Sequence, residues 1–161
     1  MLVVLFIINT CYAQDDWKVY KIDDKLSIKF PSPPRRSGDG SLMSVDKDSS
    51  AYIVMVSDLG DNVRNADSAK VASIFNNPAA ANQLKAMIQE KMSGFTMNDC
   101  KKIDWHGFPC FQIDGAEPIH HTKFYCKMLV INGNLYFIGT ALPGNRDEKV
   151  KDDFLNSLAL N

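Results

Sequence analysis

The chain has 161 residues, of which 18 are basic and 19 acidic, so its formal net charge is −1. Basic and acidic side chains are mixed along the whole sequence, which lacks the basic block of a nucleic-acid-binding surface. This length and composition predict one globular domain, large enough to bury a core, that binds no nucleic acid.

The first segment has the layout of a secretory signal peptide. An uncharged apolar run, Leu2–Ile8, leads to a small-x-small site that ends at Ala13, and polar sequence begins at Gln14. We therefore expect cleavage after Ala13, which leaves residues 14–161 as a single domain of a secreted or periplasmic protein. The apolar run is shorter than the roughly 20 residues of a membrane-spanning helix, so we expect no integral membrane span after signal removal.

The same segment leaves alternatives open. Signal peptides begin with a basic residue, and here none precedes Lys18. The start codon is then misplaced, the signal is atypical, or the segment is a buried first strand. A lipoprotein acylated at Cys11 is a further alternative, although Thr10 is bulkier than the residue that normally precedes such a cysteine.

Four strands are predicted between residues 17 and 58. The first two cover Trp17–Ile22 and Lys25–Phe30, and the second alternates apolar and polar side chains, as a half-buried strand does. The segments SLMSVDKD and AYIVMVSD are expected to pair through a turn at Asp48–Ser50. Because Tyr52–Val56 is apolar at every position, we expect a central strand that is covered on both faces.

Two helices are predicted next. Asp67 and Ser68 are candidate caps for a short first helix, while Asn77 and Pro78 supply the N-cap and the first turn of a longer one that Gly94 ends. Apolar side chains recur at helical spacing along the longer helix and are expected to fill the core: Leu84, Met87, Ile88 and Met92.

The sequence after residue 95 predicts a β-meander. A strand over Thr96–Trp105 turns at His106 and Gly107 into a strand over Phe108–Ile113. A longer turn, AEPIHH, then leads into a strand over Thr122–Ile131. Three consecutive antiparallel strands are therefore expected in this half of the chain.

The pair Asn132-Gly133 is the strongest local signal in the chain, because a type I′ two-residue hairpin needs positive φ at both positions. The turn places Met128 opposite Phe137 on the next strand. Both faces of this hairpin are apolar, so helices are expected to cover each side. A terminal helix supplies one cover through a buried stripe: Val150, Phe154, Leu155 and Leu158. We therefore predict an α/β (α+β) fold in which an antiparallel sheet meander is sandwiched between helices.

Three cysteines lie beyond the signal segment, at positions 100, 110 and 126. In an oxidising compartment two of them are expected to pair. If the AEPIHH turn is centred near Pro118, Cys110 and Cys126 face each other across neighbouring strands, so a disulfide between them is the favoured form. The alternative is three buried thiols that behave as small apolar residues.

His120, His121 and Glu117, with Asp114 nearby, form the one cluster in the sequence that suggests a metal site, because imidazoles and carboxylates are suitable ligands. Adjacent residues on a strand point to opposite faces, so both histidines reach one ion only in an irregular turn. The alternative is that they are solvated residues of a hairpin tip. A nucleophile pair of His106 and Cys110 is weaker still, since a turn histidine is ordinarily exposed.

Several stretches occur in a recognisable order: LSIKFPSPP, YIVMV, a helical middle, WHGFPCFQI, LVINGNLYFIGTALPG and FLNSL. Together they resemble small secreted bacterial proteins with the PsbP-like fold, an antiparallel sheet between helices. The extrinsic photosystem II subunit and a nuclear Ran-binding import factor share that fold. The Ala13-Gln14 junction also resembles signal cleavage sites of Bacteroidetes-type bacteria. The resemblance implies a non-enzymatic domain, while the specific functions differ from branch to branch.

We therefore expect a non-enzymatic binding or accessory module, without a cofactor, whose partner is an unknown protein or small ligand of the cell envelope. The alternative is an envelope-associated hydrolase or metal-binding protein that uses the histidines and cysteines of the meander. An exposed apolar patch favours the first function. Convergence of two histidines and a carboxylate in one pocket favours the second.

Overall fold

A computed structural model describes residues 17–66, 68–75 and 77–161, so the predicted signal segment and its cleavage site lie outside the described residues. The centre of the fold is an eight-stranded sheet with the order β3-β4-β5-β10-β9-β8-β6, in which β7 also pairs with β8. Every strand pairing in the described residues is antiparallel. Its strands are β3 (Arg35–Arg36), β4 (Leu42–Val45), β5 (Ala51–Asp58), β6 (Thr96–Met97), β7 (Lys101–Trp105), β8 (Phe108–Glu117), β9 (Thr122–Ile131) and β10 (Asn134–Leu142).

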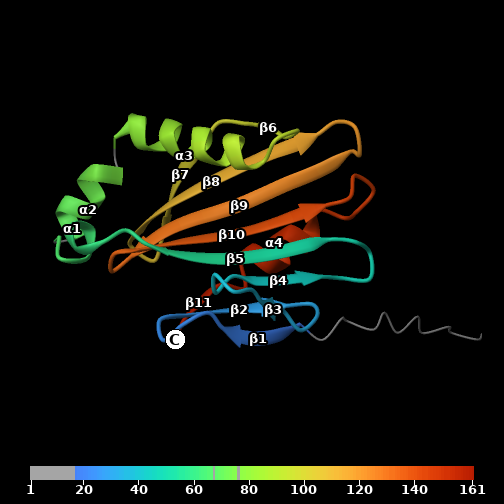
Figure 1. Ribbon diagram of the computed structural model, residues 1–161, viewed down its shortest axis with the longest axis horizontal. Helices are drawn as coiled ribbons and strands as arrows, with labels where there is room; N and C mark the ends of the chain where they lie inside the picture. The colour runs from blue at the N-terminus through green and yellow to red at the C-terminus, as the bar shows by residue number, and fades with distance from the viewer. Residues whose placement is uncertain (1–16, 67, 76) are drawn as a thin grey trace, which may run out of the picture.

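Helices lie on both faces of this sheet, which confirms the predicted arrangement (Figure 1). One face carries α2 (Ser68–Phe75) and α3 (Pro78–Lys91), which follow the short α1 (Asp61–Arg64). The other face carries α4 (Lys149–Leu155) together with a three-stranded sheet that the sequence did not lead us to expect as a separate layer. The small sheet has the order β1-β2-β11 and consists of β1 (Lys18–Lys21), β2 (Leu26–Phe30) and β11 (Ala159–Leu160).

The two faces of the large sheet bury separate cores. On the α4 side, Phe154 contacts the rings of Phe30 and Tyr52 at centroid distances of 5.5 and 5.0 Å. On the α3 side, Ile88 packs with side chains from β8 and β9 such as Phe111 and Met128. We call these the α4-side core and the α3-side core.

The Asn132-Gly133 hairpin forms as predicted. Asn132 has φ 47° and Gly133 has φ 81°, the left-handed values that a type I′ turn requires. Met128 lies opposite Phe137, in the predicted register. A local turn signal therefore fixes the pairing of the two most central strands.

The strand predicted over residues 96–105 is instead divided into β6 and β7. Met97 pairs with Gly115 but Lys101 pairs with Gln112, so residues 98–100 face only two residues of β8. One extra residue of this kind is a β-bulge, which bends a strand at the edge of a sheet. β8 is also longer than predicted, because it continues past Ile113 to Glu117.

The longer helix begins where predicted, since the side chain of Asn77 accepts a hydrogen bond of 3.0 Å from the backbone N–H of Ala79. Its predicted buried face is wrong at Met87, which is 37% exposed. The cap predicted at Asp67 lies outside the described residues. Within the described residues, no helix is both long and apolar enough to cross a membrane.

The prediction that β5 is covered on both faces is wrong. Tyr52 and Val54 are buried in the α4-side core, but Ile53 and Met55 on the opposite face are only half-buried. The reason lies in the helix layer, which has its main contacts with the sheet at β8 and β6, through α2 and α3, and has no contact of that extent with β5. An apolar part of the sheet is thus left uncovered.

Candidate functional site

The predicted disulfide between Cys110 and Cys126 does not form, and Cys100, Cys110 and Cys126 are all free thiols. Cys110 lies opposite Leu129, and Cys126 lies opposite Ile113. The turn is centred between residues 119 and 120 and not at residue 118, because Glu117 pairs with Thr122. The strands are therefore shifted, relative to the predicted register, by an odd number of residues. Because side chains alternate between the faces of a sheet, Cys110 lies in the α4-side core and Cys126 in the α3-side core, on opposite faces.

Burial also makes the two core thiols unreactive. It raises the pKa of Cys110 to about 12 and that of Cys126 well above the ordinary thiol value. The nucleophile of cysteine chemistry is the thiolate, which such pKa values suppress. Cys100 is only half-buried and its pKa is raised by the same cause.

We expect three free thiols from Cys100, Cys110 and Cys126 when the protein is denatured without reductant. In the native protein an alkylating reagent is expected to modify Cys100 first, because the other two are buried. Peptide mapping by mass spectrometry after alkylation measures both the number of free thiols and the order in which they react. A peptide pair joined through any two of these cysteines would contradict the structure.

The hairpin tip between β8 and β9 is built around Glu117. Its carboxylate accepts backbone hydrogen bonds from Ile119 at 2.8 Å and from His120 at 2.7 Å, and it contacts Nδ1 of His120 at 2.9 Å. The bond from the His120 backbone is the main cause of a lowered Glu117 pKa. Glu117 is thus a carboxylate whose oxygens already serve to shape the turn.

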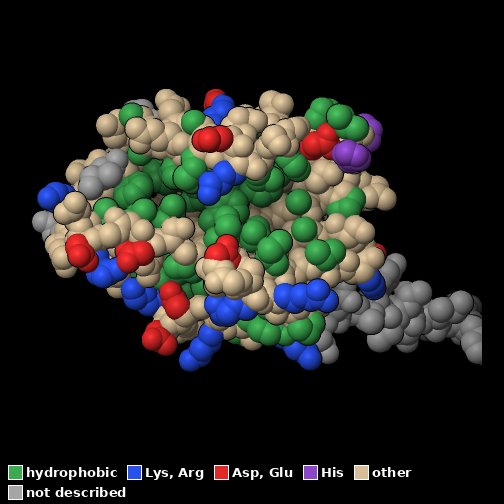
Figure 2. Space-filling model, in the orientation of Figure 1, with side chains coloured by type: hydrophobic (Ala, Val, Ile, Leu, Met, Phe, Trp, Pro, Cys, Tyr) green, Lys and Arg blue, Asp and Glu red, His purple; other side chains and the backbone are tan. Residues whose placement is uncertain are grey.

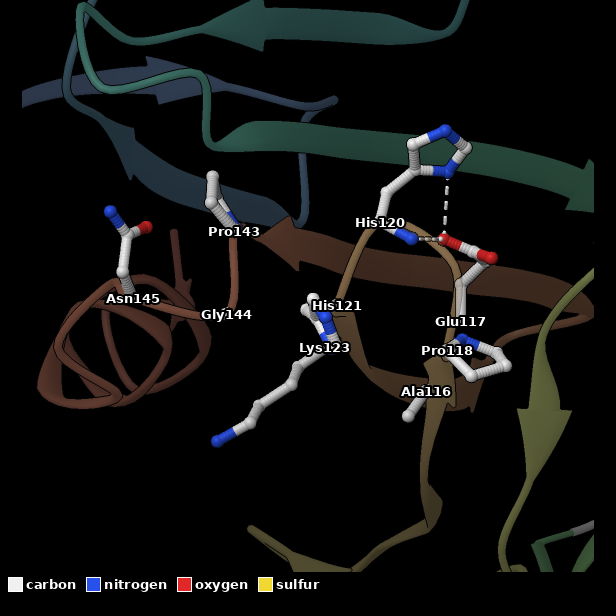
Figure 3. A pocket seen from close by; sticks show the side chains of 9 residues that line it. All are labelled: Ala116, Glu117, Pro118, His120, His121, Lys123, Pro143, Gly144 and Asn145. Atoms are coloured by element: carbon white, nitrogen blue, oxygen red, sulfur yellow. Dashed lines mark hydrogen bonds and ion pairs between the residues drawn. The ribbon is translucent and has the colours of Figure 1, made fainter.

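The two predicted metal-ligating histidines do not converge. The ring of His120 is turned toward Glu117, whereas His121 lies beside Lys123 (Figure 3). Glu117, His120, His121 and Lys123 all line one open hollow of about 620 Å³ beside the hairpin tip, together with residues 116, 118 and 143–145. Asp114 is engaged elsewhere, through the side chain of Asn98. Among the described residues, no group of three or more His, Cys, Asp or Glu side chains is placed to hold a metal ion.

The pair of His106 and Cys110 does not come together either. His106 occupies the β7–β8 turn with φ 53°, and its ring lies edge-on to Trp105 at 4.7 Å. Cys110 is fully buried on β8 and lies opposite Ile103. The ring of His106 therefore packs edge-on against Trp105, and the thiol of Cys110 lies in the core.

The most distinctive surface is the uncovered apolar part of the large sheet, which we call the sheet-face strip. The register aligns its side chains on the α3 side, since Met43 lies opposite Ile53 and Met55 lies opposite Phe137. Met43 is 48% exposed and Val45 62% exposed, while the other members are half-buried. The strip comprises Met43, Val45, Ile53, Met55 and Phe137. Hydrophobic side chains fill the centre of this face of the molecule (Figure 2).

Gly139 lies within the strip, opposite Ile53. A Cβ atom at this position would lie 3.0 Å from the ring of Phe137 and 3.2 Å from the ring of Phe124. Contacts this short require one of the rings to move. The absence of a side chain at this buried position thus lets the rings of Phe137 and Phe124 pack against the backbone of β10.

Sequence reasoning missed this site, although a signal for it exists. In β4, Leu42 and Met43 are apolar neighbours, and neighbouring residues on a strand point to opposite faces. Both faces of β4 therefore carry an apolar side chain, and both need a neighbouring element to bury it. Only the position of the helices shows that the face with Met43 lacks it.

Comparisons with known proteins bear on the fold. No known family and no curated protein matches the chain. The solution structure of cyanobacterial PsbP from Synechocystis matches with a TM-score of 0.59 and 11% identity, over 89% of this chain and 92% of that one. A crystal structure from Bacteroides thetaiotaomicron matches with a TM-score of 0.50 and 9% identity, over 84% of this chain and 45% of that one. The chain therefore has a PsbP-like, α+β fold, as the sequence resemblance implied.

Proposed function

We propose that the chain is a non-catalytic binding or accessory module that acts outside the cytoplasm and holds a partner protein through the sheet-face strip. The location is supported by the signal-like pattern of residues 1–13. The binding role is supported by the strip, because a contiguous exposed apolar surface marks an interaction site. The strip is the single observation that carries the proposal.

The strip has enough apolar surface to contribute to affinity. Complete burial of a valine or methionine side chain is worth roughly 1.5–3 kcal/mol. Met43 and Val45 retain about half of their surface for a partner to cover, and three further side chains are partly accessible. Micromolar binding needs about 8 kcal/mol in all, so the strip supplies a substantial share and polar contacts at its rim add to it.

The alternative function, a hydrolase or metal-binding protein, has weaker support. Glu117, His120 and His121 line one hollow, but among the described residues no group of three or more His, Cys, Asp or Glu side chains is placed to hold a metal ion. His106 and His120 lie at opposite ends of the ten-residue strand β8, about 30 Å apart at the rise of a strand. Cys110 and Cys126 are buried on opposite faces of the sheet. The binding role therefore remains the better supported proposal.

The strip can be tested by adding charge to its most exposed side chains. We expect the double variant Met43→Asp and Val45→Asp to fold normally but to lose at least about tenfold in binding to partner protein, because a carboxylate resists burial in an apolar interface. The measurement is the yield of each bound protein captured from the native envelope fraction. For this capture, an affinity tag is attached to the chain through a linker after Asn161.

The matched control is Val19→Asp. Val19 is 62% exposed, as Val45 is, but it lies on β1 of the small sheet. This variant is expected to capture the same proteins as the unaltered chain. Equal capture by the strip variant and the unaltered chain would show that the strip is not the docking surface.

A further inference from the structure

We propose that the occupant of the sheet-face strip is an amphipathic helix of the partner protein, which lies beside α3 and pairs its carboxylates with Arg35. This inference rests on the proposed function and adds the chemistry of the partner. It combines the width of the uncovered strip, the unpaired charge of Arg35 and the shape of the β4 edge.

The width of the strip matches one helix. The strip crosses β10, β5 and β4, which are two strand spacings wide, or about 10 Å. A helix with its side chains is about 10–12 Å across. The helix layer contains α3 over the β8 side of the sheet and no described helix over β4 and β5, so one more helix would complete it (Figure 1).

One unpaired basic side chain stands at the margin of the strip. Arg35 lies opposite Met43 and so projects on the same face as the strip. Arg35 is exposed and forms no ion pair with a described residue. Two other exposed basic residues are paired, Arg64 with Asp58 and Lys123 with Glu148. Figure 2 shows basic side chains along the lower margin of the face, with acidic side chains among them.

The charged margin and the apolar strip are continuous. Arg35, Met43 and Val45 line one hollow of about 530 Å³ at the β4 edge, together with Ser32 and Pro33. A helix seated on the strip would therefore place the residues along one of its edges within reach of the Arg35 guanidinium. Arginine–carboxylate pairs are strong and geometrically specific, which favours Glu or Asp at those positions.

A helix suits this surface better than a bilayer or a second copy of the chain. A flat bilayer would contact α3, which stands above the sheet, before it reached the strip. A second copy would bring its own α3 onto the strip, and the exposed side of α3 carries polar residues such as Asn82, Gln83 and Glu90. An amphipathic helix of another protein presents an apolar face directly.

The probe is a pair of synthetic helical peptides with the same leucine face. One peptide carries glutamates along one edge and the other carries lysines there. We expect the glutamate peptide to bind the full chain at least about tenfold more tightly. In methyl NMR spectra it should shift Met43 and Met55, and it should leave Met97, which is buried in the α3-side core, unchanged.

Charge reversal tests the role of Arg35. Arg35→Glu should abolish or reverse the preference between the two peptides, because the attraction becomes a repulsion. Lys21→Glu makes the same change in net charge on β1 and should leave the preference intact. The same two variants should behave in the same way with partner protein captured from the envelope fraction.

Several outcomes would overturn the inference. These are equal binding of the two peptides, no effect of Arg35→Glu, strip-dependent binding to phosphatidylglycerol vesicles without peptide binding, or a strip-dependent dimer of the chain in sedimentation. If partner capture depends on Met43 and Val45 but not on Arg35, this inference fails and the proposed function stands. If capture is indifferent to Met43 and Val45, the proposed function itself fails.

Discussion

Replacement of Phe154 by alanine is expected to lower the free energy of unfolding by about 3–5 kcal/mol. Phe154 is fully buried, and its ring contacts Trp17, Phe30 and Tyr52 at centroid distances of 6.4, 5.5 and 5.0 Å. The loss combines the transfer of the ring to water with a cavity that the surrounding rings cannot fill. The residue is also the point at which α4, the small sheet and the large sheet meet.

Urea unfolding followed by circular dichroism measures this change. Phe154→Leu is expected to cost less than the alanine variant, because most of the volume is kept. Val19→Ala, at an exposed position on β1, should change the midpoint little. A loss below about 1 kcal/mol for Phe154→Ala would mean that the α4-side core is not packed as described.

The second large effect is expected from Asp46→Ala, at about 3 kcal/mol. The carboxylate of Asp46 is buried and accepts hydrogen bonds from the backbone of Ser50 and from the hydroxyl of Tyr52, both at 2.9 Å. It also pairs with Arg146 at 3.4 Å. Its removal leaves the buried hydroxyl of Tyr52 without its acceptor and takes one of two carboxylate partners from the partly buried guanidinium of Arg146, which costs more than the contact itself is worth.

The test is a double-mutant cycle with Arg146→Met. The remaining partner of Arg146 is Asp48, at 2.5 Å, so the arginine keeps one ion pair when Asp46 is replaced. We expect the two substitutions together to cost less than the sum of their separate costs, because both remove the same Asp46–Arg146 ion pair. Additive losses would show that Asp46 acts through the β4–β5 turn and not through Arg146.

Local signals in the sequence predicted much of the fold. The Asn132-Gly133 turn set the register of β9 and β10 because its left-handed backbone is specified by two residues alone. The cap at Asn77 has the same local character. In β2, the alternation of residues 26, 28 and 30 placed the buried face correctly.

Features that depend on distant parts of the chain could not be predicted in this way. The β8–β9 turn has no residue pair that fixes its length, so the centre of the turn was misplaced and Cys110 and Cys126 were wrongly predicted to lie opposite each other. β11 consists of two residues that pair with β2 from the far end of the chain, and no local pattern marks it. The strip depends on where α3 stops, which is a property of the helix layer and not of β4 or β5.

Photo-crosslinking in the native envelope tests the central claim most directly. A photoreactive phenylalanine analogue replaces Val45 in one chain and Val19 in another, two positions of equal exposure on different sheets. We predict that irradiation joins a partner protein to the chain labelled at position 45 and not to the chain labelled at position 19. Crosslinks from position 19 alone, or equal crosslinks from both positions, would contradict a docking surface on the sheet-face strip.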